Sequence, residues 1–583
     1  MLFSFIRKPG GNLCLVSALV FSLLLQSFAQ QTVQPDAATP TFRVNTHLVL
    51  VDVVVKDKKG NPVAGLKMED FTVQEKGKNQ KIAFFTNPGE EQKPPSELPA
   101  GIYSNRPEYR SPGAPLTVLL IDAANTPFKD QAYARQQMLQ FVKQQYKPGQ
   151  RTAVMTLTNN LGILQDFTSD PQILVKAIDQ FKPREQELNK APAPPVLVNS
   201  ETAHGGDAGV TSGVNQELRA FQNIQLAYVL DRRVESTLAA MRSLARILGG
   251  IPGRKSIIWL TAAFPFSLIP ENREVSGEEL AESLPSIKQL GVGTRSAGAI
   301  AGAQRQEHAQ EIREAAAQLA SAQIAIYPVD VRGLVSGMEP TMDDLPSTQL
   351  ESVSEAAQMK MSDVTSSQET MREMAAETGG KAYVNQNEIK EGVALAMQDT
   401  QAAYTIGYYP DDKKMDGKYR SIKVKVNRDG VEVRNRRGYY AIDPGQKKDA
   451  TPEQQVAEAL HDKAPNTLVT FRAQAKPSEA GKIGVVFLVD ADTVSAEDAS
   501  GGSKKLNVAF YAAVFGTDGN ILASQSQKVD QAFPAETYQQ IQKQGILLQM
   551  DVPSPAGGTD VRLAVRDNRT GSVGTVTIPL TPK

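Results

Sequence analysis

Two kinds of hydrophobic pattern alternate along the chain, and the change between them predicts its domains. Almost uninterrupted apolar runs at 116–121, 152–157, 256–261 and 324–329 are typical of parallel strands that are buried on both faces of a sheet. Segments with helical spacing, such as 131–146, lie between these runs. Strands that alternate with helices predict an α/β fold with a doubly wound, mostly parallel sheet.

The regions on both sides of this segment have strand patterns instead. Residues 42–85 contain runs rich in β-branched side chains, interrupted by turns at Gly60 and Gly77. Residues 404–437 predict antiparallel strands, and further strands are predicted within 485–565. We therefore expect all-β, sandwich-like domains at the N-terminal and C-terminal sides of the α/β domain.

Turn-rich and polar stretches give the expected boundaries. The predicted order is a signal peptide at 1–29, a linker at 30–41, an N-terminal β-rich domain at 42–86, a linker at 87–115, the α/β domain at 116–402 with loop inserts at 182–213 and 265–302, a β-hairpin extension at 403–443, a linker at 444–452, and a C-terminal β-sandwich-like domain at 453–583.

The first residues have the features of a secretory signal. Arg7 and Lys8 precede an apolar run at 13–25, and Ser27 and Ala29 are small residues that suit cleavage after Ala29. The run is short for a membrane span, which needs ~20 residues, although a retained N-terminal anchor is the alternative. We expect an exported protein, periplasmic or extracellular, with no membrane span after cleavage. Because the only cysteine, Cys14, lies inside the signal, thiol chemistry is excluded from the mature chain.

Charge and composition exclude several functions. The chain of 583 residues has 63 Lys+Arg against 64 Asp+Glu, so its net charge of -1 gives no reason to expect a nucleic-acid partner. The 4 His residues are scattered, without the paired spacing of a zinc site. The glycine-rich segment 249–256 runs from a helix to a strand, the reverse of a phosphate-binding loop. The sequence therefore favours a protein that is not an enzyme.

Candidate ligands for a metal ion follow the first central strand. In the segment 122–126, Asp122 and Thr126 place a carboxylate and a hydroxyl in the loop at the carboxyl end of that strand. Ligands of such sheets bind at this edge, and oxygen atoms suit a hard divalent cation. The alternative interpretation is that both side chains bond the backbone of their own loop.

From Leu116 to about Val384 the chain resembles a von Willebrand factor A-type domain. The family's metal-ion-dependent adhesion site uses Asp-x-Ser-x-Ser, a Thr from a second loop and an Asp from a third. Thr237 matches the family's Thr, so the resemblance implies that Asp122, Thr126 and Thr237 hold Mg²⁺ or Mn²⁺. Ala124 replaces one hydroxyl and Ala262 stands where the third-loop Asp is expected, so the site is degenerate. Since Thr237 falls within a predicted helix at 218–248, a break is expected before it.

The resemblance extends to the exported "VWFA-related" proteins that are abundant in acidobacteria. It covers roughly residues 42–442 and rests on the segments 50–55, 60–66, 252–255, 327–333, 378–380 and 436–440. It implies a fold and a location in the cell envelope, and it leaves the ligand open.

Three functional hypotheses follow. The first is an exported, non-enzymatic protein of adhesion type, which presents the carboxyl edge of its central sheet to a protein or glycan partner. The second is a structural or assembly component of the bacterial envelope that uses the same domain without a metal. The third is a hydrolase whose site lies in the loop inserts.

Overall fold

The computed structural model describes most of the chain after residue 47. The described residues are 48–88, 98–110, 115–147, 149–184, 232–251, 253–264, 311–312, 314–334, 364–365, 367–412, 414–441, 451–462, 464–478 and 481–580. The predicted signal peptide with Cys14, the linker at 30–41 and nearly all of both loop inserts lie outside them. Within the described residues, no helix has both the length and the apolar character needed to cross a bilayer.

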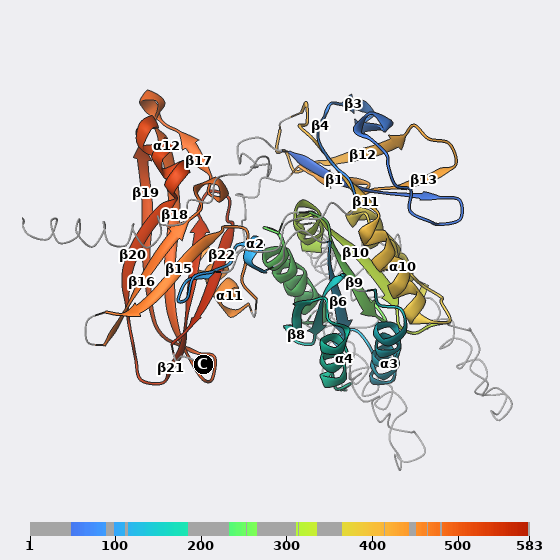
Figure 1. Ribbon diagram of the computed structural model, residues 1–583, viewed down its shortest axis with the longest axis horizontal. Helices are drawn as coiled ribbons and strands as arrows, with labels where there is room; N and C mark the ends of the chain where they lie inside the picture. Colours follow the sequence, from blue (N-terminus) through green and yellow to red (C-terminus); the bar gives the residue numbers. More distant parts are fainter. Residues whose placement is uncertain are drawn as a thin grey trace, which may run out of the picture. The chain divides into compact units, whose positions relative to one another are not determined.

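A five-stranded sheet forms the centre of the α/β domain (Figure 1). Its order is β10 (Ile324–Asp330), β9 (Lys255–Thr261), β6 (Leu116–Asp122), β7 (Arg151–Leu157) and β8 (Leu161–Thr168). The first four strands run parallel, and β8 joins the edge in the antiparallel direction. Every residue of β6, β9 and β10 is buried, which confirms that these apolar runs are buried strands.

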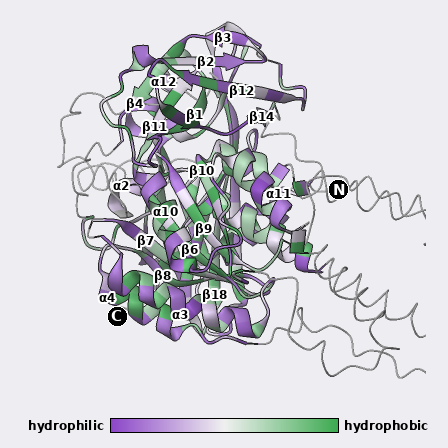
Figure 2. Ribbon diagram, turned by 90° about the vertical axis from the view of Figure 1, so that its right-hand side faces the viewer, coloured by the Kyte–Doolittle hydropathy of each residue, from purple (hydrophilic) through white to green (hydrophobic). Residues whose placement is uncertain are grey.

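Helices cover both faces of this sheet. Alternate residues of each strand point toward opposite faces, so each strand contacts helices on both sides. Leu119 and Ile121 pack with α3 (Phe128–Gln144), α4 (Pro171–Gln180) and α10 (Ile389–Gln401). Val118 and Leu120 pack on the other face with helical residues 232–248, 314–321 and 367–378. In Figure 2 the strands of this sheet are largely coloured as hydrophobic, as expected for a layer between two layers of helices.

Two four-stranded sheets form a second unit. One has the order β13 (Val431–Arg434), β1 (Val49–Asp57), β11 (Ala403–Tyr408), β4 (Ile82–Thr86). The other has the order β14 (Gly438–Tyr440), β12 (Tyr419–Val426), β2 (Phe71–Glu75), β3 (Lys78–Gln80). Val51, Phe71 and Tyr404 belong to the core that the two sheets share.

This unit, called the split β unit below, is built from segments that lie before and after the α/β domain in the sequence. Val49 in β1 pairs with Tyr408 in β11, and β2 pairs with β12. The regions 42–86 and 403–443, which the sequence pattern separates, therefore contribute strands to the same sheets. After β4 the chain forms the short strand β5 (Tyr103–Ser104), which pairs with a strand of another unit, then passes through the α/β domain and returns to the split β unit at β11.

A third unit, the C-terminal β unit, also has two sheets with a common core. The first has the order β20 (Ile546–Pro553), β16 (Lys482–Val489), β15 (Phe471–Pro477), β5 (Tyr103–Ser104). The second contains β17 (Ala496–Asp498), β18 (Lys504–Gly516), β21 (Gly558–Asp567) and β22 (Val573–Pro579), with β19 (Ile521–Phe533) paired to β18. The short strand β5 comes from the segment 87–115, which the sequence predicts as a linker.

Short helical elements complete the chain. They are η1 (Met68–Asp70), α2 (Pro107–Arg110), α11 (Pro452–His461), η3 (Ala491–Thr493), η4 (Ser500–Gly502) and α12 (Ala535–Gln544). Thr451 caps α11 by accepting a hydrogen bond from the backbone N–H of Gln454, which is a common way to satisfy the first turn of a helix.

Candidate functional site

Asp122 ends β6 at the carboxyl edge of the central sheet, and its carboxylate is fully buried. The backbone N–H of Asn125 donates to Oδ1 at 2.9 Å. The indole Nε1 of Trp259 donates to Oδ2 at 2.9 Å, and the Thr261 hydroxyl lies 2.9 Å from the same oxygen. Two side chains of β9, the neighbouring strand in the sheet, therefore form hydrogen bonds with a carboxylate that is buried away from water.

The side-chain amide of Asn125 joins this carboxylate to Thr237. Its Nδ2 donates to Asp122 Oδ2 at 2.9 Å and lies 3.0 Å from Thr237 Oγ1. The Thr237 hydroxyl donates to the backbone oxygen of Arg233 at 2.8 Å, and Arg233 Nε donates to Asn125 Oδ1 at 3.1 Å. The amide thus turns its donor side toward Asp122 and Thr237 and its acceptor side toward a guanidinium group.

Arg233 is the positive group of this site and is only partly covered. Within the described residues its Nε bonds Asn125, and its terminal nitrogens Nη1 and Nη2 have no hydrogen-bond or ion-pair partner. Arg232, its neighbour, is exposed and forms an ion pair with Glu235 at 3.3 Å. The two adjacent arginines therefore have different environments, since only Arg233 is held against the end of the sheet.

The three residues implied as metal ligands are placed in two ways. Asp122 and Thr237 come together through Asn125, whereas the hydroxyl of Thr126 accepts a hydrogen bond from the backbone N–H of Ala262 at 3.1 Å. Thr126 thus fastens its loop to the chain that follows β9. Thr237 lies inside the helix of residues 232–248, so no break occurs between Arg232 and Thr237. The chain that precedes Arg232 lies outside the described residues.

The pKa shifts of the two charged groups have the same physical cause. Burial raises the pKa of Asp122, against the opposing effect of hydrogen bonds from Asn125 and Trp259. Burial also lowers the pKa of Arg233, and the nearby Asp122 carboxylate opposes this shift. Burial therefore disfavours the charged form of both groups, and the Asp122 carboxylate favours the charged form of Arg233.

As it stands, this set of side chains does not fit Mg²⁺ or Mn²⁺. Such cations bind oxygen atoms and keep several water molecules, whereas Asp122, Asn125, Thr126 and Thr237 are each at most 2% exposed. The atom that lies between the oxygens of Asp122 and Thr237 is an amide nitrogen, a hydrogen-bond donor. The described residues also contain no group of three or more His, Cys, Asp or Glu side chains that could hold a metal.

The sequence pattern places Asp122 at this edge of the sheet. It did not single out Arg233 or Trp259. One signal was available for Arg233, which stands four residues before Thr237 and therefore on the same face of a helix. The contact of Trp259 with Asp122 depends on the parallel pairing of β6 with β9, which joins residues 137 positions apart.

A second acidic group at the same edge is already paired within the chain. Asp330, at the end of β10, accepts hydrogen bonds from Arg332 Nε and Nη2, each at 2.8 Å. Gln368 Nε2 donates to its Oδ2 at 3.0 Å. Because these donors already bond both oxygens, Asp330 is a weaker candidate for a ligand site than Arg233.

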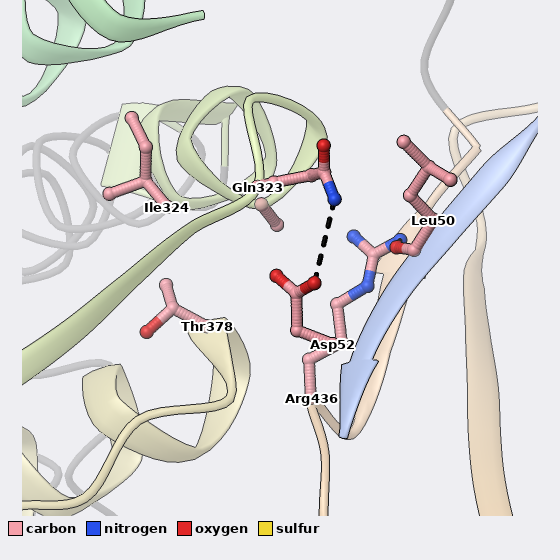
Figure 3. A pocket seen from close by; sticks show the side chains of 7 residues that line it. Leu50, Asp52, Gln323, Ile324, Thr378 and Arg436 are labelled. Atoms are coloured by element: carbon pink, nitrogen blue, oxygen red, sulfur yellow. Dashed lines mark hydrogen bonds between the residues drawn. The ribbon is translucent and has the colours of Figure 1, made fainter. Parts of the chain in front are cut away.

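The opposite, amino edge of the sheet carries a small cavity, which Figure 3 shows from close by. Its volume is about 10 Å³, the space that one water molecule needs, so it has no room for a substrate. Asp52 of β1 and Gln323, which precedes β10, approach one another there with Nε2 3.5 Å from Oδ1. Arg436 also lines the cavity and donates from Nη2 to the backbone oxygen of Leu50 at 2.8 Å.

Two more cations lie at this amino edge, immediately before and at the start of β9. Arg254 places Nη1 3.6 Å from Asp52 Oδ2 and donates from Nη2 to the Tyr327 hydroxyl at 2.8 Å. Lys255 is 1% exposed, and its Nζ donates to the Ile251 backbone oxygen at 2.5 Å. Burial lowers the pKa of Lys255 to about 7, although Asp52 acts in the opposite direction.

Comparisons with known proteins give no family. No family model matches the chain, and no curated protein matches it. Among solved structures, it is similar to an aerotolerance-related membrane protein from Bacteroides fragilis, with 12% identity and a TM-score of 0.22 over 49% of this chain and 98% of that chain. It is also similar to a von Willebrand factor type A protein from Catenulispora acidiphila, with 8% identity and a TM-score of 0.21 over 92% of this chain and 73% of that chain. Likenesses of this size support no functional conclusion.

Proposed function

We propose that this chain is an exported, non-enzymatic docking protein that binds a carboxylate of a protein or glycan partner through Arg233 and without a metal ion. The observation that carries the proposal is the bridge made by Asn125. Its amide nitrogen lies between Asp122 and Thr237, and its amide oxygen holds the guanidinium of Arg233. The positive charge at this edge of the sheet is therefore an arginine of the chain itself.

The chemistry of the guanidinium group indicates the class of ligand. A guanidinium presents a rigid, planar pair of donors that matches the two oxygens of a carboxylate. Here the bond from Nε to Asn125 fixes the plane, and Nη1 and Nη2 have no partner among the residues that the structure describes. Asp122 neutralises the arginine in the free protein, so a ligand carboxylate adds one net negative charge. With this net charge at the site, a partner that has few carboxylates and additional apolar contacts fits better than a strongly charged polymer.

Exposed apolar side chains at the same edge support a docking function. Phe128 begins α3, two residues after Thr126, and is 53% exposed. Leu334, four residues after the end of β10, is 62% exposed. Aromatic side chains such as Phe128 are enriched at protein interfaces. A partner that presents a carboxylate beside an apolar group would contact both kinds of residue.

Export is the second part of the proposal, and it rests on the predicted signal at 1–29. The resemblance of residues 42–442 to exported envelope proteins gives it further support. In the cell envelope, a metal-free docking domain would suit both an adhesion-type protein and an assembly component, the first two hypotheses from the sequence, because both need the same kind of docking surface.

The proposal is tested with an array of immobilised peptides that carry Asp or Glu, each matched with its Asn or Gln counterpart. The mature chain should bind some acidic peptides, and Arg233→Ala should weaken that binding at least about ten-fold, as expected when a charge-assisted hydrogen bond is lost. Arg232→Ala, which removes an adjacent but exposed arginine, is the matched control and should bind like the unchanged chain. Equal binding to the amide peptides would contradict the proposal.

The role of metal ions is tested in the same assay. Binding should be unchanged by a chelator, and calorimetric titration with Mg²⁺ or Mn²⁺ should give no heat of binding. Metal binding by Asp122, Thr126 and Thr237 remains a prediction of the family resemblance until this titration is done. Chelator-sensitive docking together with a measurable heat would favour that prediction over an arginine-centred site.

A further inference from the structure

The strand β19 (Ile521–Phe533) has an unusual environment for its length. It comprises 13 residues and pairs with β18 along its whole length, from Lys504 opposite Phe533 to Phe515 opposite Ile521. Its other edge pairs with no strand in the part of the chain that the structure describes. A strand of 13 residues therefore has one edge whose backbone donors and acceptors pair with no strand among the described residues.

The side chains of β19 do little to block such pairing. Most of them are exposed, and only a few, including Val529 and Phe533, contact the core of the C-terminal β unit. Natural edge strands are usually protected by charged residues, proline, bulges or a short length. The strand contains no proline, and its two charges, Lys528 and Asp530, have opposite signs and lie on either side of Val529.

We propose that two copies of this chain associate by pairing β19 with β19, antiparallel about a two-fold axis at Val529. In this register Lys528 of each copy lies opposite Asp530 of the other, so the symmetry creates two cross-strand ion pairs. Gln527 lies opposite the second copy's Gln531, where two amides can bond one another. The interface is isologous, as is usual in symmetric dimers, and it pairs residues 525–533 of one copy with the same residues of the other.

Charge selects this register over its neighbours. An axis at Lys528 would place two ammonium groups directly opposite one another, and an axis at Asp530 would do the same with two carboxylates. Like charges at opposing positions of a sheet destabilise it, whereas opposite charges contribute about 0.2–1 kcal/mol per pair. Within one copy, Lys528 Nζ lies 3.0 Å from Asp530 Oδ2, which shows that both side chains project from the same face of β19. They therefore remain on one face in the paired sheets.

The register is tested by two single substitutions and their mixture, using the mature full chain. Lys528→Glu places carboxylates opposite carboxylates at both pairs, and Asp530→Lys places ammonium groups opposite ammonium groups. Sedimentation equilibrium should show a dimer for the unchanged chain and an affinity at least about ten-fold weaker for each variant, since two favourable pairs become repulsive. An equal mixture of the variants should restore the affinity as a heterodimer, because each carboxylate then faces an ammonium group.

The mixture of variants distinguishes an effect on the dimer interface from an effect on contacts within one chain. Each substitution also disturbs the ion pairs of Asp530 with Lys528 and Lys505, and mixing cannot repair those contacts. Fluorescence energy transfer between differently labelled variants reports the heterodimer directly, and urea unfolding of each variant checks its fold. A monomeric unchanged chain, dimers that survive both substitutions, or variants that do not associate when mixed would each overturn the proposal. Arg233→Ala should dimerise normally, so this test is independent of the docking function.

Discussion

The two edges of the central sheet hold similar charged groups in different surroundings. At the amino edge, Asp52 faces Arg254, and β1 and the residues before β14 close over the pair. At the carboxyl edge, Asp122 faces Arg233, but Asn125 stands between them and the ends of the guanidinium have no partner among the described residues. The difference shows that a carboxylate and a guanidinium group can form an ion pair directly, as Asp52 and Arg254 do, or be separated by an amide, as Asp122 and Arg233 are.

The stability of the amino edge depends on the pairing of its buried charged and polar groups. Asp52 accepts a hydrogen bond from the Thr405 hydroxyl at 2.6 Å in addition to its contact with Arg254. Arg254 also donates to the backbone oxygen of Gly379 at 3.1 Å, and Tyr327 accepts from the same nitrogen. Because these groups are covered, removing any one of them leaves a buried charge without compensation.

The largest effect is therefore expected for Asp52→Ala. It leaves Arg254 and Arg436 without a counter-charge, and breaking a buried pair in this way costs about 3–5 kcal/mol in the free energy of unfolding. Urea unfolding followed by the fluorescence of Trp259, the only tryptophan, measures this loss in the central sheet. Arg232→Ala removes an exposed ion pair and should cost less than about 0.5 kcal/mol. A similar loss for both variants would show that the contacts of Asp52 contribute no more to the free energy of unfolding than an exposed ion pair does.

A smaller effect, visible as a pH dependence, is expected from Lys255. Burial lowers its pKa from 10.5 in the unfolded chain to about 7 in the folded protein. Between these values the unfolded chain binds a proton that the folded protein lacks, so the free energy of unfolding rises with pH. One pKa unit corresponds to 1.36 kcal/mol, and the gain from about pH 7 to about pH 9 should be roughly 2–3 kcal/mol.

Lys255→Met tests this dependence at nearly constant volume. The variant should be more stable than the unchanged chain at pH 7, and the rise toward pH 9 should be reduced or absent. The measurement is urea unfolding at a series of pH values with Trp259 as the probe. An unchanged slope in the variant would assign the pH dependence to other groups.

The smallest effect on stability, with a clear effect on binding, is expected for Arg233→Lys. The substitution keeps the positive charge but removes the planar pair of donors and the bond from Nε to Asn125. We expect the free energy of unfolding to change by less than about 1 kcal/mol and the affinity for acidic peptides to fall about ten-fold. Full affinity in the lysine variant would show that charge alone, without guanidinium geometry, determines docking.

Sequence predicted the central sheet better than the units around it. The runs that became β6, β9 and β10 are apolar at nearly every position because both faces of each strand are covered by helices. In contrast, the range 485–565 was predicted to contain strands but the bounds of β19 were not given, since its exposed side chains leave no alternation of apolar and polar residues. The shared sheets of 49–86 and 403–440 were also missed, because pairing between distant strands leaves no local pattern.

The candidate site was predicted at the level of individual residues but not of their contacts. The position of Asp122 after an apolar run was sufficient to place it at the carboxyl edge. The orientation of the Asn125 amide depends on Arg233, which approaches from a helix 108 residues later in the chain. A sequence pattern of metal ligands cannot reveal this arrangement, because the groups involved, an amide and a guanidinium, are not part of that pattern.

The pairing of β1 with β11 has a consequence for biogenesis. In a polypeptide that crosses a membrane N-terminus first, Val49 emerges long before Tyr408, its partner. If the chain is exported as proposed, β1 and β4 have no partner strand until β11 and β13 follow, whereas β2 pairs with β3 of the same N-terminal segment. Chaperones that shield waiting strands, and any pause in translocation before β11, would then govern the yield of this protein.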